Sequence, residues 1–298
     1  MSLLRLTKLL ELRDLPIEEY HSNGLISSSM IKFKLANDWR GFQRRYITKD
    51  WPREEKESFQ IGQAAEDAVC GRDTFIVRPK TITIPKKNPE EGEEGQTEEV
   101  PLKFTTKEGK AWRAAHAGKL IIENKYESLF TKGIENLWNN SEASALIKAG
   151  IEQVTFQAQW GDDAGIQARP DWWIPEGSEL TRFVPCAPDL KTTVRWGNWD
   201  RVIADYGYHI QAALVRMTSP AESTSHPLIF LEKTEPHRVQ VVWLAESWIE
   251  LGIEQVHAFV DGWEKCMKSG VWPLVDSESV ESNAPEWMLE KWRAINGL

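Results

Sequence analysis

Alternating apolar and polar positions predict a pair of strands in the middle of the chain. Between Glu152 and Trp160 every second side chain is apolar, and glutamine or threonine fills the positions between them. A period of two is typical of a strand with one buried face. The stretch 161–165, GDDAG, predicts a turn, and the alternation resumes from Ile166 to Ile174. A third strand is expected from Phe183 to Lys191.

Apolar residues at steps of three or four predict helices on both sides of these strands. One helix is expected after Ser27–Ser29, a second over 59–71, and mainly helical structure over 106–150. Another helix is expected after Arg201, and a last one from Ile249 to about Gly270. Further strands are expected over 75–84, 226–233 and 237–244. The acidic stretch 86–101 is expected to be a mobile loop, because it is almost devoid of apolar residues.

This order of elements predicts an α/β fold with a central mixed sheet flanked by helices. We expect one domain over 1–298. Its expected parts are an N-terminal helical portion (about 1–72), the acidic loop (about 86–101), a core (about 106–245), and a C-terminal helix with a tail (246–298).

Composition and charge change this picture little. The 298 residues carry a net charge of −9, distributed unevenly: 11 Lys/Arg against 9 Asp/Glu up to Gln60, but 4 against 10 from Glu246 onward. A locally basic face can bind nucleic acid on an acidic protein, so the net charge excludes no such partner.

No apolar run approaches the roughly 18 residues of a membrane helix, and the N-terminus has no apolar signal region. We therefore expect a cytoplasmic protein without a membrane partner. The three cysteines are far apart and have no metal-ligand spacing, which fits a reducing compartment. Their number also argues against an iron–sulfur cluster, which needs about four thiolates.

Asp171, Asp189 and Lys191 are the candidate reaction centre. Asp189 and Lys191 are two positions apart, so they share one face of a strand, and Asp171 belongs to the preceding strand. Carboxylate oxygens suit Mg²⁺, and the backbone carbonyl of Leu190 is a further candidate ligand. Lys191 could position a water or neutralise developing phosphate charge. The alternative is a turn aspartate beside a solvated surface ion pair.

Three segments together resemble the RecE-type branch of PD-(D/E)XK exonucleases, which are phage and prophage recombination enzymes distantly similar to lambda exonuclease. They are GIEQVTFQAQWGDDAGIQARPDWWIP (150–175), PDLKTT (188–193) and ADYGYHIQAALV (204–215). The likeness extends from about Tyr20 to Trp287 and includes GQAAEDAV and GKAWRAAHAGK. It implies a restriction-endonuclease-like core.

The resemblance implies that Asp171 and Asp189 coordinate the metal and that Lys191 is the catalytic lysine. Glu66, in GQAAEDAV, stands where the family often has a histidine. Glutamate is a hard oxygen ligand suited to Mg²⁺, so the family role can be retained; the alternative is an exposed helix glutamate.

Gln211 matches the glutamine of the family's helical Q-x-x-x-Y motif, which implies that it braces the catalytic site. Val215 occupies the place of the tyrosine, so half of the motif is missing. Tyr208 and His209 lie one helical turn away, and they are either substitutes for that tyrosine or core residues.

Further residues are candidates for contact with DNA. Ser29 resembles a serine that contacts the 5′-terminal phosphate in lambda exonuclease, although helix capping would also explain a serine there. Arg44 and Arg169 are basic candidates for phosphate contact. Glu152 matches a glutamate typical of the group, and it is either a supporting acid near the site or a charge at a strand end.

The resemblance implies a Mg²⁺-dependent exonuclease, with Mn²⁺ able to substitute, that digests duplex DNA from its ends in the 5′→3′ direction. It would leave 3′ single strands for a strand-annealing partner protein and act as a ring-shaped trimer or tetramer. The alternatives are a restriction-like or repair endonuclease of the same superfamily and a non-catalytic DNA-binding protein. Joint retention of Asp171, Asp189 and Lys191 argues against the last.

Overall fold

Two three-stranded sheets form the framework of the molecule. The computed structural model describes residues 6–13, 15–52, 54, 56–86, 96–161, 164–176, 185–221 and 223–274. One sheet is antiparallel, in the order β1-β7-β8; the other, in the order β10-β11-β12, is mixed, because β10 and β11 run parallel and β12 antiparallel. The strands are β1 (Leu6–Leu12), β7 (Thr155–Trp160), β8 (Ala164–Ala168), β10 (Asp189–Thr193), β11 (Pro227–Glu232) and β12 (Val239–Trp243).

The predicted hairpin is confirmed, with two interruptions. The apolar set of β7 is buried, and its register pairs Phe156 with Ala168 and Trp160 with Ala164. Gln153 has a φ of +52° and separates a short strand, β6 (Ile151–Glu152), from β7. The second strand stops at Ala168, and a short strand paired with β6, β9 (Trp172–Trp173), begins after Pro170.

The prediction for the third strand is displaced. β10 begins at Asp189 and continues past Lys191 to Thr193, so the acidic residue opens the strand. Pro185 and Pro188 precede it, and proline cannot donate a ladder hydrogen bond, which places the strand start after them. Residues 183–184 lie outside the described part of the chain.

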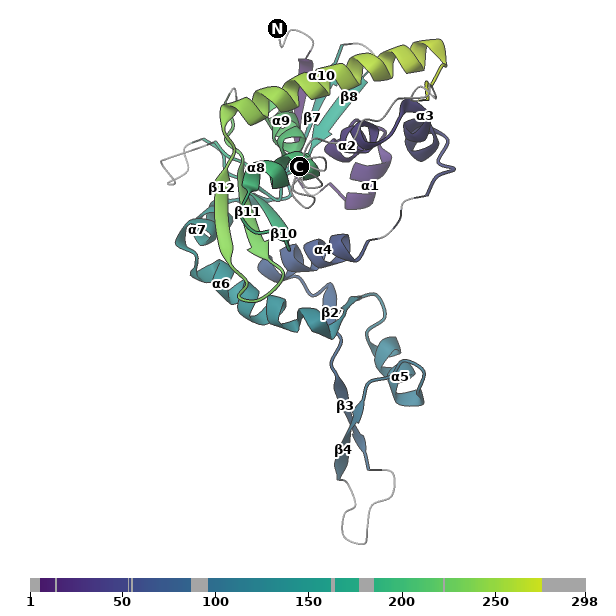
Figure 1. Ribbon diagram of the computed structural model, residues 1–298, viewed down its shortest axis with the longest axis vertical. Coiled ribbons are helices and arrows are strands. Elements are labelled where there is room, and N and C mark those ends of the chain that lie inside the picture. Colours follow the sequence, from purple (N-terminus) through teal and green to yellow (C-terminus); the bar gives the residue numbers. More distant parts are fainter. Residues whose placement is uncertain are drawn as a thin grey trace, which may run out of the picture.

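Helices surround the two sheets (Figure 1). They are α1 (Ile17–Ser22), α2 (Ser28–Ala36), α3 (Trp39–Phe42), η1 (Gln43–Ile47), α4 (Glu57–Val69), α5 (Lys107–Ala115), η2 (Asn124–Tyr126), η3 (Leu129–Gly133), α6 (Ile134–Asn139), α7 (Ser141–Ala149), α8 (Trp199–Tyr206), α9 (Tyr208–Thr218) and α10 (Glu246–Ser269). None of the helices in the described ranges is long and apolar enough to cross a bilayer.

Local chemistry explains where these helices break. The segment expected to be helical after Arg201 divides at Gly207, whose φ of +61° ends α8 and precedes α9. The first predicted helix ends at Ala36, since the Asp38 carboxylate accepts the Gly41 N–H at 2.6 Å and starts α3. The N-terminal portion is also not wholly helical, because β1 pairs with β7.

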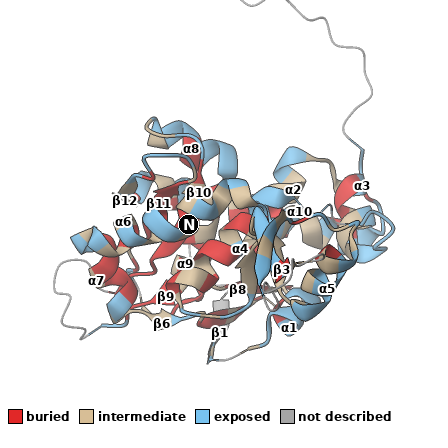
Figure 2. Ribbon diagram, turned by 90° about the horizontal axis from the view of Figure 1, so that it is seen from below, coloured by how far each residue is buried: buried red, intermediate tan, exposed pale blue. Residues whose placement is uncertain are grey.

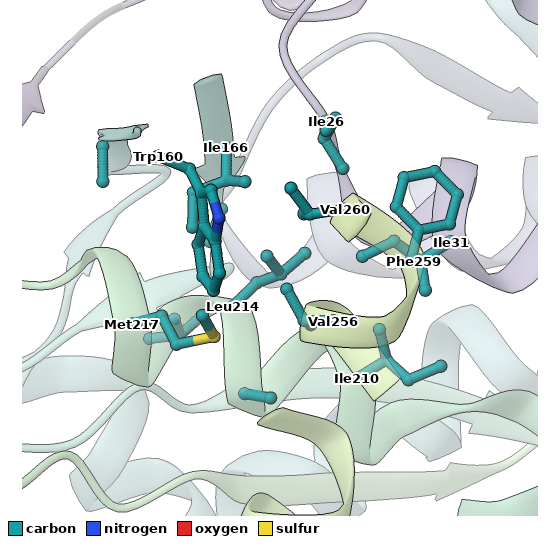
Figure 3. Packing of buried hydrophobic residues seen from close by; sticks show 14 of the residues in the cluster. Ile26, Ile31, Trp160, Ile166, Ile210, Leu214, Met217, Val256, Phe259 and Val260 are labelled. Carbon is teal, nitrogen blue, oxygen red and sulfur yellow. The ribbon is translucent and has the colours of Figure 1, made fainter. Parts of the chain in front are cut away.

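Helix α9 lies at the centre of the first hydrophobic core. Its apolar residues pack between β7 and β8 on one side and α10 on the other, with Leu214 between Trp160 and Val256 (Figure 3). A second core lies where α4, α7 and the strands β10 and β11 meet, and Figure 2 shows buried residues gathered there. Together the two cores hold α4, α9 and β10 at fixed positions.

A protruding arm corrects the prediction of a mobile acidic loop over 86–101. Residues 97–101 form a strand, β4 (Thr97–Pro101), which pairs antiparallel with β3 (Thr81–Pro85). Residues 87–95 lie outside the described part of the chain. Figure 1 shows this hairpin projecting from the body with α5 beside it. We call residues 78–119 the arm.

The arm leaves and rejoins the body at a short parallel strand pair. β2 (Phe75–Val77) precedes it and β5 (Leu120–Ile122) follows it, and the two pair along their full length. The single strand expected over 75–84 is therefore two strands, β2 and β3, with different partners.

Candidate active site

The start of β10 places Asp189 and Lys191 together, as the period of two predicts. The Asp189 side chain is fully buried and forms an ion pair with the Lys191 ammonium. The Gln211 side chain, on α9, donates a hydrogen bond to Asp189 Oδ1 at 3.0 Å. The alternative of a solvated surface ion pair is thereby excluded, and Gln211 lies where the predicted brace would act.

Asp171 lies in the gap between β8 and β9 and reaches β10. The Leu190 backbone N–H donates to Asp171 Oδ2 at 2.7 Å, so this carboxyl lies directly beside the Asp189–Lys191 segment. The break in the strand after Ala168, which includes Pro170, is what frees Asp171 to face β10. The use of the Leu190 carbonyl as a metal ligand stays a prediction.

Glu66 approaches the same centre from α4. One turn earlier, Gly62 faces β10, and a Cβ placed there would lie 3.8 Å from Thr192 Oγ1. The Glu66 carboxylate accepts hydrogen bonds from the Gln153 amide and from Arg72, the latter at 3.3 Å. Because its side chain is only 12% exposed, the alternative of an exposed helix glutamate is excluded.

The three acidic groups perturb one another. Burial raises the pKa of Asp171 well above its usual range, and the negative charges of Asp189 and Glu66 raise it further. Burial also opposes ionisation of Asp189, but the charge of Lys191 and a hydrogen bond from Asp171 hold its pKa below the usual range. Burial raises the pKa of Glu66. A cation bound here would relieve this mutual repulsion.

The predicted ligands suit a divalent cation, although they are not grouped around one point. Among the described residues no three His, Cys, Asp or Glu side chains are assembled as a metal site. Asp189 is engaged by Lys191, Asp171 by a backbone N–H, and Glu66 by Gln153 and Arg72. The donors are nevertheless hard carboxylate oxygens largely withdrawn from solvent and close enough to repel one another, the kind of set that Mg²⁺ or Mn²⁺ binds.

Two residues that the sequence did not indicate connect these groups. Gln153 donates its backbone N–H to the Asp171 carbonyl at 2.9 Å and its side chain to Glu66. Arg72 bridges Glu66 to Glu152, with 2.6 Å to Glu152 Oε2. Neither contact leaves a signal in the sequence, because the partners lie about eighty residues apart.

Tyr208 is the aromatic group of the site. Its ring centroid lies 5.2 Å from Lys191 Nζ and 5.5 Å from Lys32 Nζ, so the ring is in cation–π contact with two ammonium groups. Burial, followed by repulsion from Lys191, lowers the pKa of Lys32 to about 8. Lys32, on α2, is a second cation of the centre that the sequence pattern did not single out.

The other residues of the incomplete Q-x-x-x-Y motif are structural. Val215 is fully buried in the first core. His209 is buried and its Nε2 shares a hydrogen bond with Gln255, on α10, at 2.8 Å. Of the two candidates for the missing tyrosine, Tyr208 therefore lies at the site and His209 does not.

The predicted phosphate-binding residues lie at different places. Ser29 is exposed, and its hydroxyl is 3.0 Å from that of Ser27; Ser27 makes no side-chain cap bond, so capping does not explain the serines. Arg44 pairs with Asp50 at 3.2 Å. Arg169 donates to Leu15 O at 2.8 Å and to Gln153 Oε1 at 2.5 Å, which anchors the site from behind. Their contacts with DNA stay predictions.

Glu152 is a supporting charge rather than a member of the buried group. Its side chain is 48% exposed and pairs with Arg72, whose other nitrogen binds Glu66. Glu152 thus acts on the site through Arg72.

The fold is of the PD-(D/E)XK nuclease class. Its marks are a mixed sheet, a buried aspartate at the start of a strand with a lysine two positions later, and a second aspartate from the break in the preceding hairpin strand. The chain belongs to the family described as the PDDEXK-like domain of unknown function (DUF3799), whose match spans residues 45–283.

One solved structure with this architecture is that of a protein from Eubacterium rectale provisionally named an exonuclease. The two chains are 14% identical and superpose with a TM-score of 0.54 over 93% of this chain and 98% of that chain. At this identity the likeness establishes the fold. No curated protein matches the sequence. The RecE-type branch stays a prediction.

Proposed function

We propose that the protein is a divalent-cation-dependent deoxyribonuclease whose reaction centre is Asp171, Asp189 and Lys191, with Glu66 as a third acidic group. The observation that carries this proposal is the group of neighbouring charged side chains: Asp189, fully buried and ion-paired with Lys191, and Asp171, held beside them by the Leu190 N–H. Burial of three charged groups is costly unless a ligand uses them, and functional sites are where such clusters persist.

Each side chain has a separate task in this proposal. Asp171, Asp189 and Glu66 would hold Mg²⁺ or Mn²⁺, which supplies Lewis-acid stabilisation of the scissile phosphate when bound. Gln211 fixes the orientation of the Asp189 carboxylate, and the Leu190 N–H fixes that of Asp171.

Lys191 would hold the attacking water and offset negative charge on the phosphate. Its charge is secure for this task, because Asp189 and Asp171 raise the pKa of its ammonium despite burial. The face of Tyr208 beside it limits where its ammonium can lie.

We further propose that the enzyme digests duplex DNA from its ends, 5′→3′, and leaves 3′ single strands for an annealing partner protein. The resemblance to RecE-type enzymes supports this mode, as does the name given to the Eubacterium rectale protein. The same resemblance supports a ring-shaped trimer or tetramer around the DNA.

The test is digestion of linear duplex labelled at either the 5′ or the 3′ end, with and without a 5′ phosphate, in the presence of Mg²⁺ or of a chelator. We expect Mg²⁺-dependent release of the 5′ label first, and little cleavage of sealed circular duplex. Rapid digestion of the circle would contradict the exonuclease proposal and favour an endonuclease.

The variant Asp189→Asn tests the site itself. We expect at least a roughly 100-fold loss of cleavage, because both the metal ligand and the partner of Lys191 are changed. Glu254→Gln, an exposed change of the same kind on α10, is the matched control. Full activity in a folded Asp189→Asn protein, verified by circular dichroism, would refute the site.

A further inference from the structure

The arm has no evident purpose within the fold. Its two strands are mostly exposed, with Ile84 as the buried residue of β3 and none in β4. Figure 1 shows the hairpin extending away from the body of the molecule. A projecting element that buries so little apolar surface stabilises the body weakly, which leaves a contact outside the chain as the role to consider for it.

The charge of the arm is opposite to that of the rest of the protein. Its described residues, 78–86 and 96–119, contain 8 Lys/Arg and 3 Asp/Glu. The connecting residues 87–95 add 1 Lys and 4 Glu, so the arm totals 9 against 7, a balance of +2. The remaining chain has 27 Lys/Arg and 38 Asp/Glu, a balance of −11.

The positive charge of the arm is concentrated on α5 and the turn before it. Lys103, Lys107, Lys110 and Arg113 are exposed, and no carboxylate within the described ranges forms an ion pair with any of them. Thr106 caps α5 by accepting the Gly109 N–H at 3.1 Å, so the positive end of the helix dipole lies beside these lysines.

The arm holds this basic face in a fixed geometry. Gly109 packs against the chain so closely that a Cβ would lie 1.9 Å from Lys103 O. The Phe104 and Trp112 rings stack with 6.1 Å between their centroids, and the Arg78 guanidinium lies 4.4 Å from the centroid of the Phe104 ring. The backbone positions that carry these cations are therefore fixed relative to one another before binding, which suits a ligand with regularly spaced charges.

We propose that the arm binds the phosphate backbone of duplex DNA outside the reaction centre, through Lys103, Lys107, Lys110 and Arg113. This inference rests on the proposed nuclease function for the identity of its ligand. Along the chain, the arm follows α4, the helix of Glu66, and the short strand β2. Its last residue, Lys119, pairs with Asp73, which lies between α4 and β2. DNA held by the arm is thereby tied to the element that supplies one side of the site.

The experiment measures binding rather than cleavage. Fluorescence anisotropy with a labelled duplex, without divalent cations and over a series of salt concentrations, compares the wild type with Lys107→Gln/Lys110→Gln. The matched control is Lys265→Gln/Lys268→Gln, which removes the same charge from exposed positions on α10, at the opposite end of the molecule (Figure 1).

We expect the arm variant to bind at least about tenfold more weakly near 0.1 M salt, with a salt slope lower by about 2, because two phosphate contacts are lost. The control should bind as the wild type does. Equal affinity and slope in the arm variant and the control would overturn the proposal.

Two further outcomes separate this inference from the proposed function. If the arm variant keeps its affinity for DNA but loses self-association in sedimentation, the arm is a protein contact and the proposal is wrong. If the protein binds duplex through the arm but cleaves nothing, the arm inference stands and the nuclease proposal falls.

Discussion

Asp171 and Asp189 differ in their environments although both carboxyls belong to the same site. Asp189 has a lysine ion pair and an amide donor, whereas Asp171 has a backbone donor and two acidic neighbours. The pKa of Asp171 is therefore raised and that of Asp189 is lowered. Of these two carboxyls, Asp171 therefore holds its proton up to a higher pH than Asp189 does.

Cation binding should release that proton. A metal favours the ionised carboxylate, so under the proposed function Mg²⁺ should lower the pKa of Asp171, and its affinity should increase with pH across the range in which Asp171 titrates. Calorimetric titration with Mg²⁺ in two buffers of different ionisation heat measures the release. In Asp171→Asn the buffer-dependent heat should vanish; its persistence would assign the proton to another group.

His226 should make the protein sensitive to acid. Burial lowers the pKa of His226 from 6.5 to about 4, and neither ring nitrogen has a hydrogen-bond partner among the described residues. As pH falls from 6.5 toward 4, the unfolded chain takes up a proton that the folded state does not. Stability should therefore fall across this window, by roughly 3 kcal/mol in total.

The measurement for His226 is the free energy of unfolding in urea at several pH values. His226→Leu should reduce the loss between pH 6.5 and 4. Asp189 contributes its own acid-side loss, because its pKa is lowered, so the comparison is the difference between wild type and variant. Parallel curves for the two proteins would show that His226 is not responsible.

The sequence could indicate residues of the site that share a local pattern. The spacing of Asp189 and Lys191 on one strand needs only the period of two, and Asp171 follows from the adjacent hairpin. Lys32, Gln153 and Arg72 could not be found in this way. Their roles depend on contacts between distant segments, and on a positive φ at Gln153 that no local pattern requires.

At the scale of elements, the crossing of α9 and α10 depends on a missing side chain. A Cβ at Gly252, on α10, would lie 2.4 Å from the His209 carbonyl oxygen and 2.8 Å from Ala213 Cβ, both on α9. The helices must separate to admit even a methyl group. Because α9 also carries Gln211, its displacement would reach the Asp189 carboxylate.

Gly252→Ala should destabilise the protein by about 1–3 kcal/mol, the usual cost of overpacking. Gly62→Ala is the matched control, because a Cβ there makes ordinary contact at 3.8 Å and alanine favours a helix interior. Chemical denaturation of both variants gives the comparison. If Gly252→Ala is as stable as Gly62→Ala, close packing at this crossing does not limit stability.

Element types were more predictable than element ends. The hairpin and the final helix follow directly from apolar spacing. The breaks at Gly207, Gln153 and Asp38 were missed, because each depends on backbone conformation or capping rather than on apolar spacing. β4 was missed for another reason: its stretch is acidic and mostly exposed, and its pairing with β3 supplies the order that apolar burial does not.

At the scale of the whole molecule, positive and negative charge are concentrated in different parts of the fold. The net negative charge of the protein comes from the body, whereas the arm and the N-terminal portion each have a small net positive charge. Composition alone therefore misrepresents the surface that a polyanion would meet. The fold class was predictable from the order of elements, whereas the division into two sheets was not, since it follows from the interruptions around Pro170 and Pro188.

Because β2 and β5 pair with each other in parallel, the arm is an insert between two neighbouring strands of the body. The polypeptide leaves the body at the end of β2 and returns at the start of its neighbour, so any insert able to cross back over that strand preserves the register Phe75 with Leu120. Evolution can lengthen, shorten or exchange such an insert without repacking the cores. Relatives that share this body can therefore differ most in how they hold their ligands.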